Sequence, residues 1–132
     1  MKPKNERYTI AVDFDGVINS YKTPWKAAHI IPDEPVDGAI AWLHEMIQKF
    51  DVVIFSTRCK SFRGRWAVSR WIMKHAGNLY WENAAGGIGL EDLKYSASKP
   101  AALIYLDDRA IRFEGVFPTS EQIHRAKPWN KR

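Results

Sequence analysis

The stretch Tyr8–Asn19, with the sequence YTIAVDFDGVIN, decides the fold. Its first five residues are apolar or β-branched and have the length of a buried strand. Asp13 and Asp15 follow at once, with Phe14 between them and Gly16 behind. A buried strand that ends in two acids and then turns predicts a chemical site at its carboxyl end.

Two other apolar runs have the same character and the same kind of ending. Asp51–Phe55 (DVVIF) is followed by Ser56, and Ala102–Leu106 (ALIYL) is followed by an acidic pair. Short runs that are apolar on both faces are typical of strands in a parallel sheet covered by helices.

Amphipathic helices are predicted between and after these strands. Segments Val36–Phe50 and Ser61–His75 repeat apolar residues at spacings of three and four. Thr119 and Gln122 have the spacing of a capping box that starts a last short helix, Ser120–Ala126. The buried stripes of the two longer helices are expected at Ile40, Leu43, Ile47 and Phe50 and at Phe62, Trp66, Ser69 or Arg70, and Met73.

The alternation of strand and helix predicts an α/β fold. We expect a three-layer α/β/α sandwich with a mostly parallel, Rossmann-like sheet, formed by residues 1–132 as a single domain. We interpret Asn78–Asn83 (NLYWEN) as a further short strand and the glycine-rich Ala84–Leu90 as a mobile loop.

Composition narrows the setting in which the chain works. No apolar run reaches the roughly 20 residues of a membrane span, so we expect no membrane association. The single cysteine excludes an internal disulfide and favours a cytoplasmic location. A net charge of +5 would attract phosphates or nucleic acid, although part of it lies in the terminal segments, which we interpret as solvated tails.

The three strand ends should bring their polar residues together, because ligands of open parallel sheets bind at the carboxyl ends of strands. Four carboxylates in one crevice repel each other unless a cation lies among them, and oxygen ligands of this kind suit Mg²⁺. The sequence therefore predicts a metal site at this edge. The residues expected to meet there are Asp13, Asp15, Ser56, Thr57, Arg58, Asp107 and Asp108.

The same motifs resemble those of the haloacid dehalogenase (HAD) superfamily. Val12–Ile18 (VDFDGVI) looks like its first motif, and Val52–Arg58 (VVIFSTR) is similar to its second. Lys99 fits the lysine of the third motif, and Leu103–Arg109 (LIYLDDR) fits the acidic fourth. All four occur in the order that the family has.

The resemblance implies a Mg²⁺-dependent phosphohydrolase, a phosphomonoesterase that works through an aspartyl-phosphate. Asp13 would be the nucleophile, Asp15 the general acid and base, and Ser56 and Lys99 would bind the phosphoryl group. The metal ligands implied are Asp13, Asp107 and the backbone carbonyl of Asp15, with Asp108 either a further ligand or a partner that orients the waters of the metal. The substrate contacts implied are Gly16, Thr57, Arg58 and Arg109.

The site is expected to be open, because Val17–Pro35 is too short to fold as a separate cap domain, and open sites of this family accept large substrates or are covered by another subunit. An open site of this kind suits a phosphorylated small molecule, a nucleotide or a nucleic-acid end, or a homodimer in which another subunit covers it. The ending in DDR resembles the phosphatase domain of polynucleotide kinases and is similar to a segment of the deoxyribonucleotidases, which have a larger cap. Trp25 or Trp129 could stack on a base.

Simpler interpretations stay open for several of these residues. Asp13 and Asp15 could be turn formers, and Ser56 and Thr57 could cap the next helix. Lys99 could be an ordinary surface lysine, with Lys94 as the competitor for its role, and Arg58 and Arg109 either bind substrate or pair with the surplus acids. The alternative function is a catalytically silent module of the same fold that binds phosphate or nucleic acid.

Overall fold

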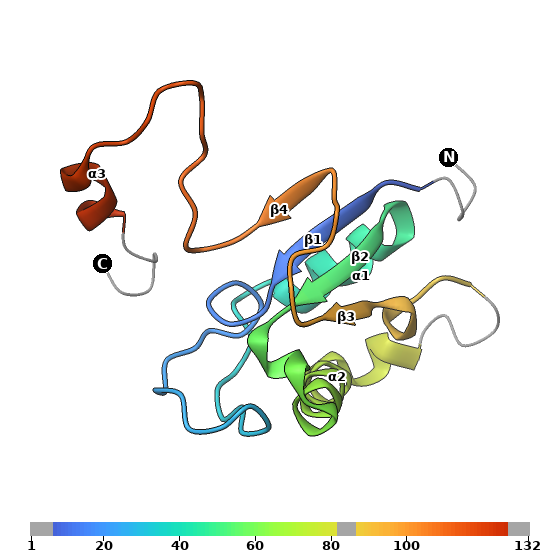
Figure 1. Ribbon diagram of the computed structural model, residues 1–132. Coiled ribbons are helices and arrows are strands. Elements are labelled where there is room, and N and C mark those ends of the chain that lie inside the picture. The colour runs from blue at the N-terminus through green and yellow to red at the C-terminus, as the bar shows by residue number, and fades with distance from the viewer. Residues whose placement is uncertain (1–6, 82–86, 127–132) are drawn as a thin grey trace.

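A four-stranded parallel sheet lies at the centre of the computed structural model, which describes residues 7–81 and 87–126. Its strands are β1 (Thr9–Asp13), β2 (Asp51–Phe55), β3 (Lys94–Ser96) and β4 (Ile104–Leu106), in the order β3-β2-β1-β4. All three strand pairings are parallel, so the carboxyl ends of the strands face the same way (Figure 1). The prediction of an α/β fold with a parallel sheet is confirmed.

The three strands predicted from the sequence are present with small shifts at their ends. The third, β4, was expected to be buried, but Ile104–Leu106 is exposed because β4 lies at the edge of the sheet. β1 runs one residue further than expected, so Asp13 is its last residue. β4 begins two residues later than expected, although the N–H of Leu103 already bonds to the carbonyl of Thr9 (2.8 Å). The edge strand β3 was not predicted, because its sequence KYS is short and has no apolar run.

Two helices, α1 (Ala39–Lys49) and α2 (Phe62–Ala76), bury one face of the sheet. Ile10 pairs with Val52 and Val12 with Ile54, and alternation along the strands places these four side chains on the same face. They form one core cluster with buried residues of both helices, among them Leu43, Ile47, Val68 and Ile72. A second helical layer, on the opposite face, stays a prediction.

The buried stripe of α1 agrees with the expectation at Leu43 and Ile47, but that of α2 does not. Phe62 is 92% exposed and Trp66 is 61% exposed, so the predicted buried face of α2 is wrong. The helix instead buries the stripe Gly64, Val68, Trp71 and Ile72.

Trp71 explains why α2 turns this face inward. Its ring packs edge-on against Phe14 at a centroid distance of 5.1 Å, and its indole N–H donates to the carbonyl of Asp33 (3.0 Å). Trp71 thereby buries apolar surface with its polar atom satisfied. Periodicity alone could not select between the two stripes, because both carry a tryptophan.

The segment between α2 and β3 differs from the expected strand and loop. Gly77–Trp81 forms a 3₁₀ helix, η3, where the sequence predicted a strand, and Leu90–Asp92 forms another, η4. The rest of the predicted strand and the first part of the predicted loop lie outside the described residues. Residues 82–86 separate the two described parts of the chain.

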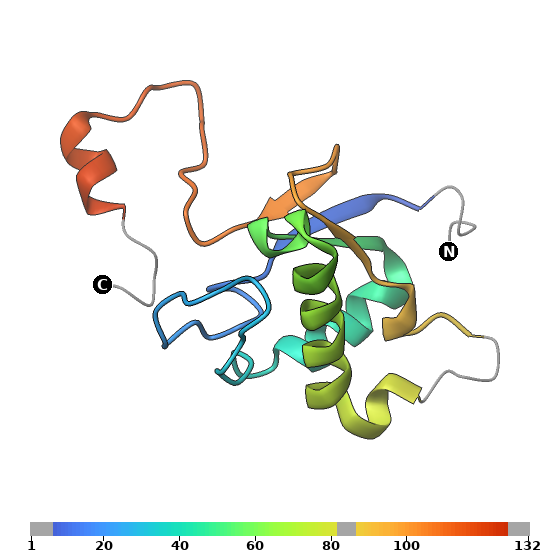
Figure 2. The same cartoon turned by 60° about the horizontal axis from the view of Figure 1, so that its bottom comes forward.

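After β4 the chain leaves the sheet as an arm that ends in α3 (Ser120–Arg125), away from the other helices (Figures 1 and 2). The predicted capping box is confirmed, since the Thr119 hydroxyl accepts from the N–H of Gln122 and the Gln122 side chain accepts from that of Thr119. α3 buries none of its side chains. Within the described ranges, the helices are all too short or too polar to span a membrane.

Candidate functional site

A tight turn follows β1 and carries the second acid of the motif. The carbonyl of Phe14 accepts hydrogen bonds from the N–H groups of Ile18 (3.0 Å) and Asn19 (2.9 Å). Gly16 has a φ of +89°, and a Cβ there would lie 2.2 Å from Oδ2 of Asp108. Both the backbone and the space therefore require glycine, and the turn lies directly against the acidic pair that follows β4.

Three carboxylates meet at this end of the sheet, from Asp13 at the end of β1 and from Asp107 and Asp108 just after β4. Each offers one oxygen, and these oxygens all lie within 4.8 Å of one another. The Oδ1 atom of Asp108 is buried and accepts no hydrogen bond from the residues that the structure describes. Three of the four predicted metal ligands are therefore placed together, around a position that would suit a cation.

The acids of this triad differ in their electrostatic surroundings. Burial, a hydrogen bond with Asp108 and the charges of Asp107 and Asp108 raise the pKa of Asp13 from 3.8 to about 8. Burial would also raise the pKa of Asp107, but the N–H of Arg109 and the ammonium of Lys99 lower it below its ordinary value. Without a cation, the carboxyl group of Asp13 is thus expected to keep its proton near neutral pH.

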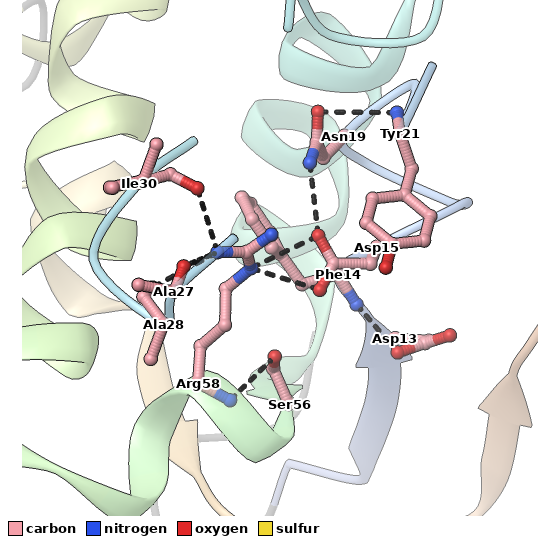
Figure 3. Close-up of polar contacts among 10 residues, drawn as sticks. All are labelled: Asp13, Phe14, Asp15, Asn19, Tyr21, Ala27, Ala28, Ile30, Ser56 and Arg58. Atoms are coloured by element: carbon pink, nitrogen blue, oxygen red, sulfur yellow. Dashed lines mark hydrogen bonds and ion pairs between the residues drawn. The ribbon is translucent and has the colours of Figure 1, made fainter. Parts of the chain in front are cut away.

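Asp15 lies only two residues after Asp13, yet its carboxylate belongs to a different set of contacts (Figure 3). Nε of Arg58 donates to both of its oxygens, at 3.1 and 2.9 Å, and the side-chain amide of Asn19 donates to Oδ1 at 2.9 Å. Arg58 is 2% exposed and Asn19 is fully buried. Asp15 is therefore held by fixed partners, and its carboxylate lies outside the triad.

Arg58 also ties the loop after the turn to the site. Its terminal nitrogen donates to the carbonyls of Ala27, Ala28 and Ile30 at 3.0–3.1 Å, and its guanidinium lies over the ring of Trp25, 4.3 Å from the centroid. Of the two roles that the sequence left open for Arg58, the structure shows the pairing with an acid. A planar guanidinium can make these contacts at once, whereas a lysine could not.

Ser56 and Thr57 follow β2, and both line the pocket described below. The Ser56 hydroxyl accepts from the N–H of Arg58 (3.1 Å) and so caps the 3₁₀ helix η2 (Thr57–Lys60). The longer helix α2 has its own cap, since the Ser61 hydroxyl accepts from the N–H of Gly64 (3.0 Å). Ser56 therefore caps η2 and not the helix near Ser61 that one interpretation assigned to it, and its hydroxyl keeps a hydrogen that can be donated to a ligand.

Lys99 lies at the site on the short connection between β3 and β4. Its Nζ is 3.0 Å from Oδ2 of Asp107 and lies near the rings of Phe55 and Tyr105, at 5.6 and 5.5 Å from their centroids. Lys94, the competing lysine, is exposed on β3 and does not line the pocket. The choice of Lys99 from the sequence agrees with this placement.

A pocket of about 360 Å³ opens beside the triad and receives most of the predicted residues. The predicted residues that do not line it are Gly16, Arg58, Asp107 and Asp108. Asp108 faces the turn at Gly16, Arg58 is buried beneath the loop, and Asp107 pairs with Lys99. The lining residues are Asp13, Asp15, Tyr21, Trp25, Phe55, Ser56, Thr57, Ala97, Ser98, Lys99 and Arg109.

Sequence reasoning missed two contributors to this site, Asn19 and Tyr21. Asn19 is the last residue of the opening motif stretch, and its burial could not be inferred from a position in an expected loop. Tyr21 has a φ of +55°, which is uncommon for a residue other than glycine, and it places an aromatic ring on the pocket wall beside Trp25. The only sequence signal for either was closeness to Asp15. Trp129, the other proposed stacking residue, lies outside the described residues.

The chain was compared with protein-family models, with curated proteins and with solved structures, and none of the three comparisons found a match. The function is therefore inferred from the residues of the site and from their geometry.

Proposed function

We propose that this protein is a Mg²⁺-dependent phosphomonoesterase of the HAD type that forms an aspartyl-phosphate on Asp13. The observation that carries the proposal is the acidic triad with its buried, unpartnered Asp108 oxygen, beside Lys99 and an open pocket. In the same proposal the fold is the three-layer sandwich of that superfamily.

The donor set of the triad fits a hard divalent cation. All three groups offer carboxylate oxygens, which Mg²⁺ prefers, and the Oδ1 atom of Asp108 lacks a partner that a cation would supply. Asp13, Asp107 and Asp108 would hold the ion, which would supply positive charge to the oxygens of a phosphoryl group. The raised pKa of Asp13 supports this fit, because burial and the neighbouring acids disfavour its charged form and a cation would offset both.

Asp13 is placed to act as the nucleophile, since it lies at the end of the central strand β1 and faces the pocket. Its carboxylate oxygen would attack phosphorus, and the bond from phosphorus to the leaving oxygen would break. Asp15 would give a proton to the leaving oxygen. Asp15 would then take a proton from a water molecule, whose attack on phosphorus breaks the bond to Asp13 and releases inorganic phosphate.

Positive charge and hydrogen-bond donors around the pocket support the same reaction. A phosphoryl group in transfer carries charge on three oxygens, and fixed donors stabilise that charge. Lys99 and Ser56 line the pocket together with Asp13, and Arg109 lines it as an exposed cation. Arg58 would act through Asp15, which it holds in place, rather than on the substrate.

The test is phosphate release from a panel of phosphomonoesters, with and without Mg²⁺, by the wild type, Asp13→Asn and the matched control Asp37→Asn. Asp37 is an exposed acid before α1 and undergoes the same chemical change. We expect Mg²⁺-dependent turnover by the wild type and the control, and none by Asp13→Asn. Equal turnover by both variants would overturn the proposal. Inorganic phosphate binding without turnover would instead favour the silent binding module.

A further inference from the structure

Much of the positive charge of this chain lies on one segment of the fold. Residues 57–77 hold six of the twenty lysines and arginines and none of the fifteen aspartates and glutamates. The terminal segments, residues 1–7 and 125–132, hold seven basic side chains and one acidic one, so part of the positive charge is terminal, as expected. Residues 57–77 consist of η2, α2 and the residue on either side of α2.

The exposed side of α2 combines these cations with two large aromatic rings. Phe62, Arg63, Trp66, Arg70 and Lys74 are three or four residues apart, so they share one side of the helix, which we call the α2 outer face. All five are exposed, and the guanidinium of Arg70 lies 4.7 Å from the centroid of the Trp66 ring. An aromatic pair left in water on a helix whose opposite side is well packed indicates a surface that binds a partner.

The chemistry of the α2 outer face is unusual for a solvated helix surface. Exposed helices commonly pair a cation with an acid four residues away, as Glu45 and Lys49 do on α1. Among the described residues, no acid forms an ion pair with Arg63, Arg70 or Lys74. The face therefore offers free positive charge next to flat apolar rings.

We propose that the α2 outer face binds single-stranded nucleic acid, with phosphates on Arg63, Arg70 and Lys74 and bases stacked on Phe62 and Trp66. Interleaved cations and aromatic rings are the means by which proteins bind unpaired strands, because every base has a face that can stack. A duplex hides those faces. A second copy of this chain is disfavoured as the partner, since two such faces would repel each other.

The position of α2 connects this surface to the pocket. A Cβ on Gly64 would lie 2.0 Å from the carbonyl oxygen of Arg58, so the first turn of the helix is packed directly on η2. Thr57, the first residue of η2, lines the pocket. α2 follows η2 (Figure 2), and its 15 residues give it a length of about 22 Å. A strand on the outer face could thus place its terminal phosphate in the pocket, a consequence that rests on the proposed function.

The aromatic part of the proposal is tested by the affinity for a fluorescently labelled oligonucleotide without terminal phosphates, measured by anisotropy. The double variant Phe62→Ala/Trp66→Ala should raise the Kd by at least about tenfold. The control Phe117→Ala removes a ring that is 82% exposed on the arm and should leave the Kd unchanged. Equal effects of the two changes, or no binding by the wild type, would overturn the proposal. DNA and RNA strands are measured in parallel, and binding of either one supports it.

The cations are tested by the dependence of affinity on salt. Each phosphate contact contributes about 0.7 to the slope of log K against log salt for a single strand. Arg63→Gln/Arg70→Gln should lower that slope by about 1.4, whereas the control Lys94→Gln/Arg112→Gln, on β3 and the arm, should not change it. Equally tight binding to polyglutamate or to anionic vesicles would show a general affinity for polyanions and would also overturn the proposal.

The proposed phosphatase activity and the proposed nucleic-acid surface can be tested separately. Asp13→Asn should still bind the unphosphorylated oligonucleotide, and the α2 variants should still hydrolyse a small phosphomonoester at the wild-type rate and keep the wild-type melting temperature. Hydrolysis by a wild type that does not bind the oligonucleotide would contradict only the proposal of a nucleic-acid surface. Oligonucleotide binding without any hydrolysis would contradict only the proposed phosphatase activity.

Discussion

Asp13 and Asp15 stand two residues apart at the end of the same strand, yet their surroundings are opposite in kind. Asp15 accepts three hydrogen bonds, from Arg58 and from Asn19. Asp13 faces two further acids, and its pKa is raised to about 8. One carboxylate is paired within the protein, and the other lies among further acids in a position that would suit a cation.

The difference arises from which element approaches each acid. β4 brings Asp107 and Asp108 beside Asp13 through its parallel pairing with β1, whereas η2 brings Arg58 beneath Asp15. The turn at Gly16 follows both acids and lies against Asp108. An acidic motif can therefore hold one carboxylate that is fixed by partners within the protein and one that faces a site for a cation.

The largest effect should come from replacing the crowded acid. Asp13→Asn should lower phosphate release by about 10⁴-fold or more, because the nucleophile is lost. The same change should raise the melting temperature of the metal-free protein, since it removes one of three clustered carboxylates. Thermal unfolding and phosphate assays on the same samples would show both. A loss of activity together with a lower melting temperature would contradict the contrast between the two acids.

Removing the partner of the paired acid should mainly affect stability. Arg58→Met leaves Asp15 without its cation and frees the loop at Ala27 and Ile30, and breaking a buried ion pair costs about 3–5 kcal/mol. Urea unfolding would measure this cost. Arg58→Lys is the matched control for charge, and it should still destabilise because it cannot reach the carbonyls and the acid together. An unchanged free energy of unfolding in Arg58→Met would show that the contacts of Arg58 do not stabilise the fold.

Cation binding should stabilise the protein, and the effect should grow with pH. In the folded, metal-free protein the pKa of Asp13 is raised from 3.8 to about 8, so the folded state binds more protons than the unfolded chain between these values. The free energy of unfolding without metal should therefore fall as pH rises from 3.8 toward 8. The lowered pKa of Asp107 acts in the opposite direction, in the acid range below its ordinary value.

Added Mg²⁺ should reverse this loss, by about 2.7 kcal/mol at a concentration one hundred times the Kd. Denaturation curves at several pH values, with Mg²⁺ and with a chelator, would measure both effects. Asp108→Asn serves as the comparison, because it removes a ligand and should reduce the gain from Mg²⁺. A stability that does not change with Mg²⁺ at pH 8 would show that the triad is not a cation site.

The smallest effect concerns Gly16, in the turn that follows the two acids. Gly16→Ala would strain a residue with a positive φ and push a methyl group against Asp108, at a cost of about 1–3 kcal/mol. Gly38→Ala is a fitting control, since its φ is also positive but a Cβ there meets no atom within 4 Å. The control should lose stability while keeping Mg²⁺ affinity, and Gly16→Ala should lose both. Equal Mg²⁺ affinity in the two variants would show that the contact with Asp108 is unimportant.

Much of the framework was predictable from the sequence, because strand ends and acids are local signals. DVVIF forms the buried strand that it predicts, and the meeting of Asp13 with Asp107 and Asp108 followed from parallel pairing. ALIYL also forms a strand, but the expectation that it is buried was wrong, because Ile104–Leu106 is exposed. The choice of Lys99 over Lys94 followed from its closeness to β4.

What could not be predicted depends on packing between distant segments. Whether Arg58 turns inward to Asp15 or outward to a substrate depends on the loop carbonyls that receive it, and a single sequence does not place that loop. The face of α2 was mistaken for a similar reason, since Trp66 and Trp71 fit a buried stripe equally well until Phe14 and Asp33 decide between them.

The pairing of β4 with β1 has a consequence for the order in which the protein folds. β1, α1, β2 and α2 follow one another along the chain, whereas Ile104 must find Ile10 across nearly the whole sequence. Contacts between such distant residues form late, because closing the long intervening loop has an entropic cost. Asp107 and Asp108, which follow β4, would then reach their positions late in folding. An ion bound by the triad would slow the separation of β4 from β1. Amide exchange of β4 should therefore be slower with Mg²⁺ than without it.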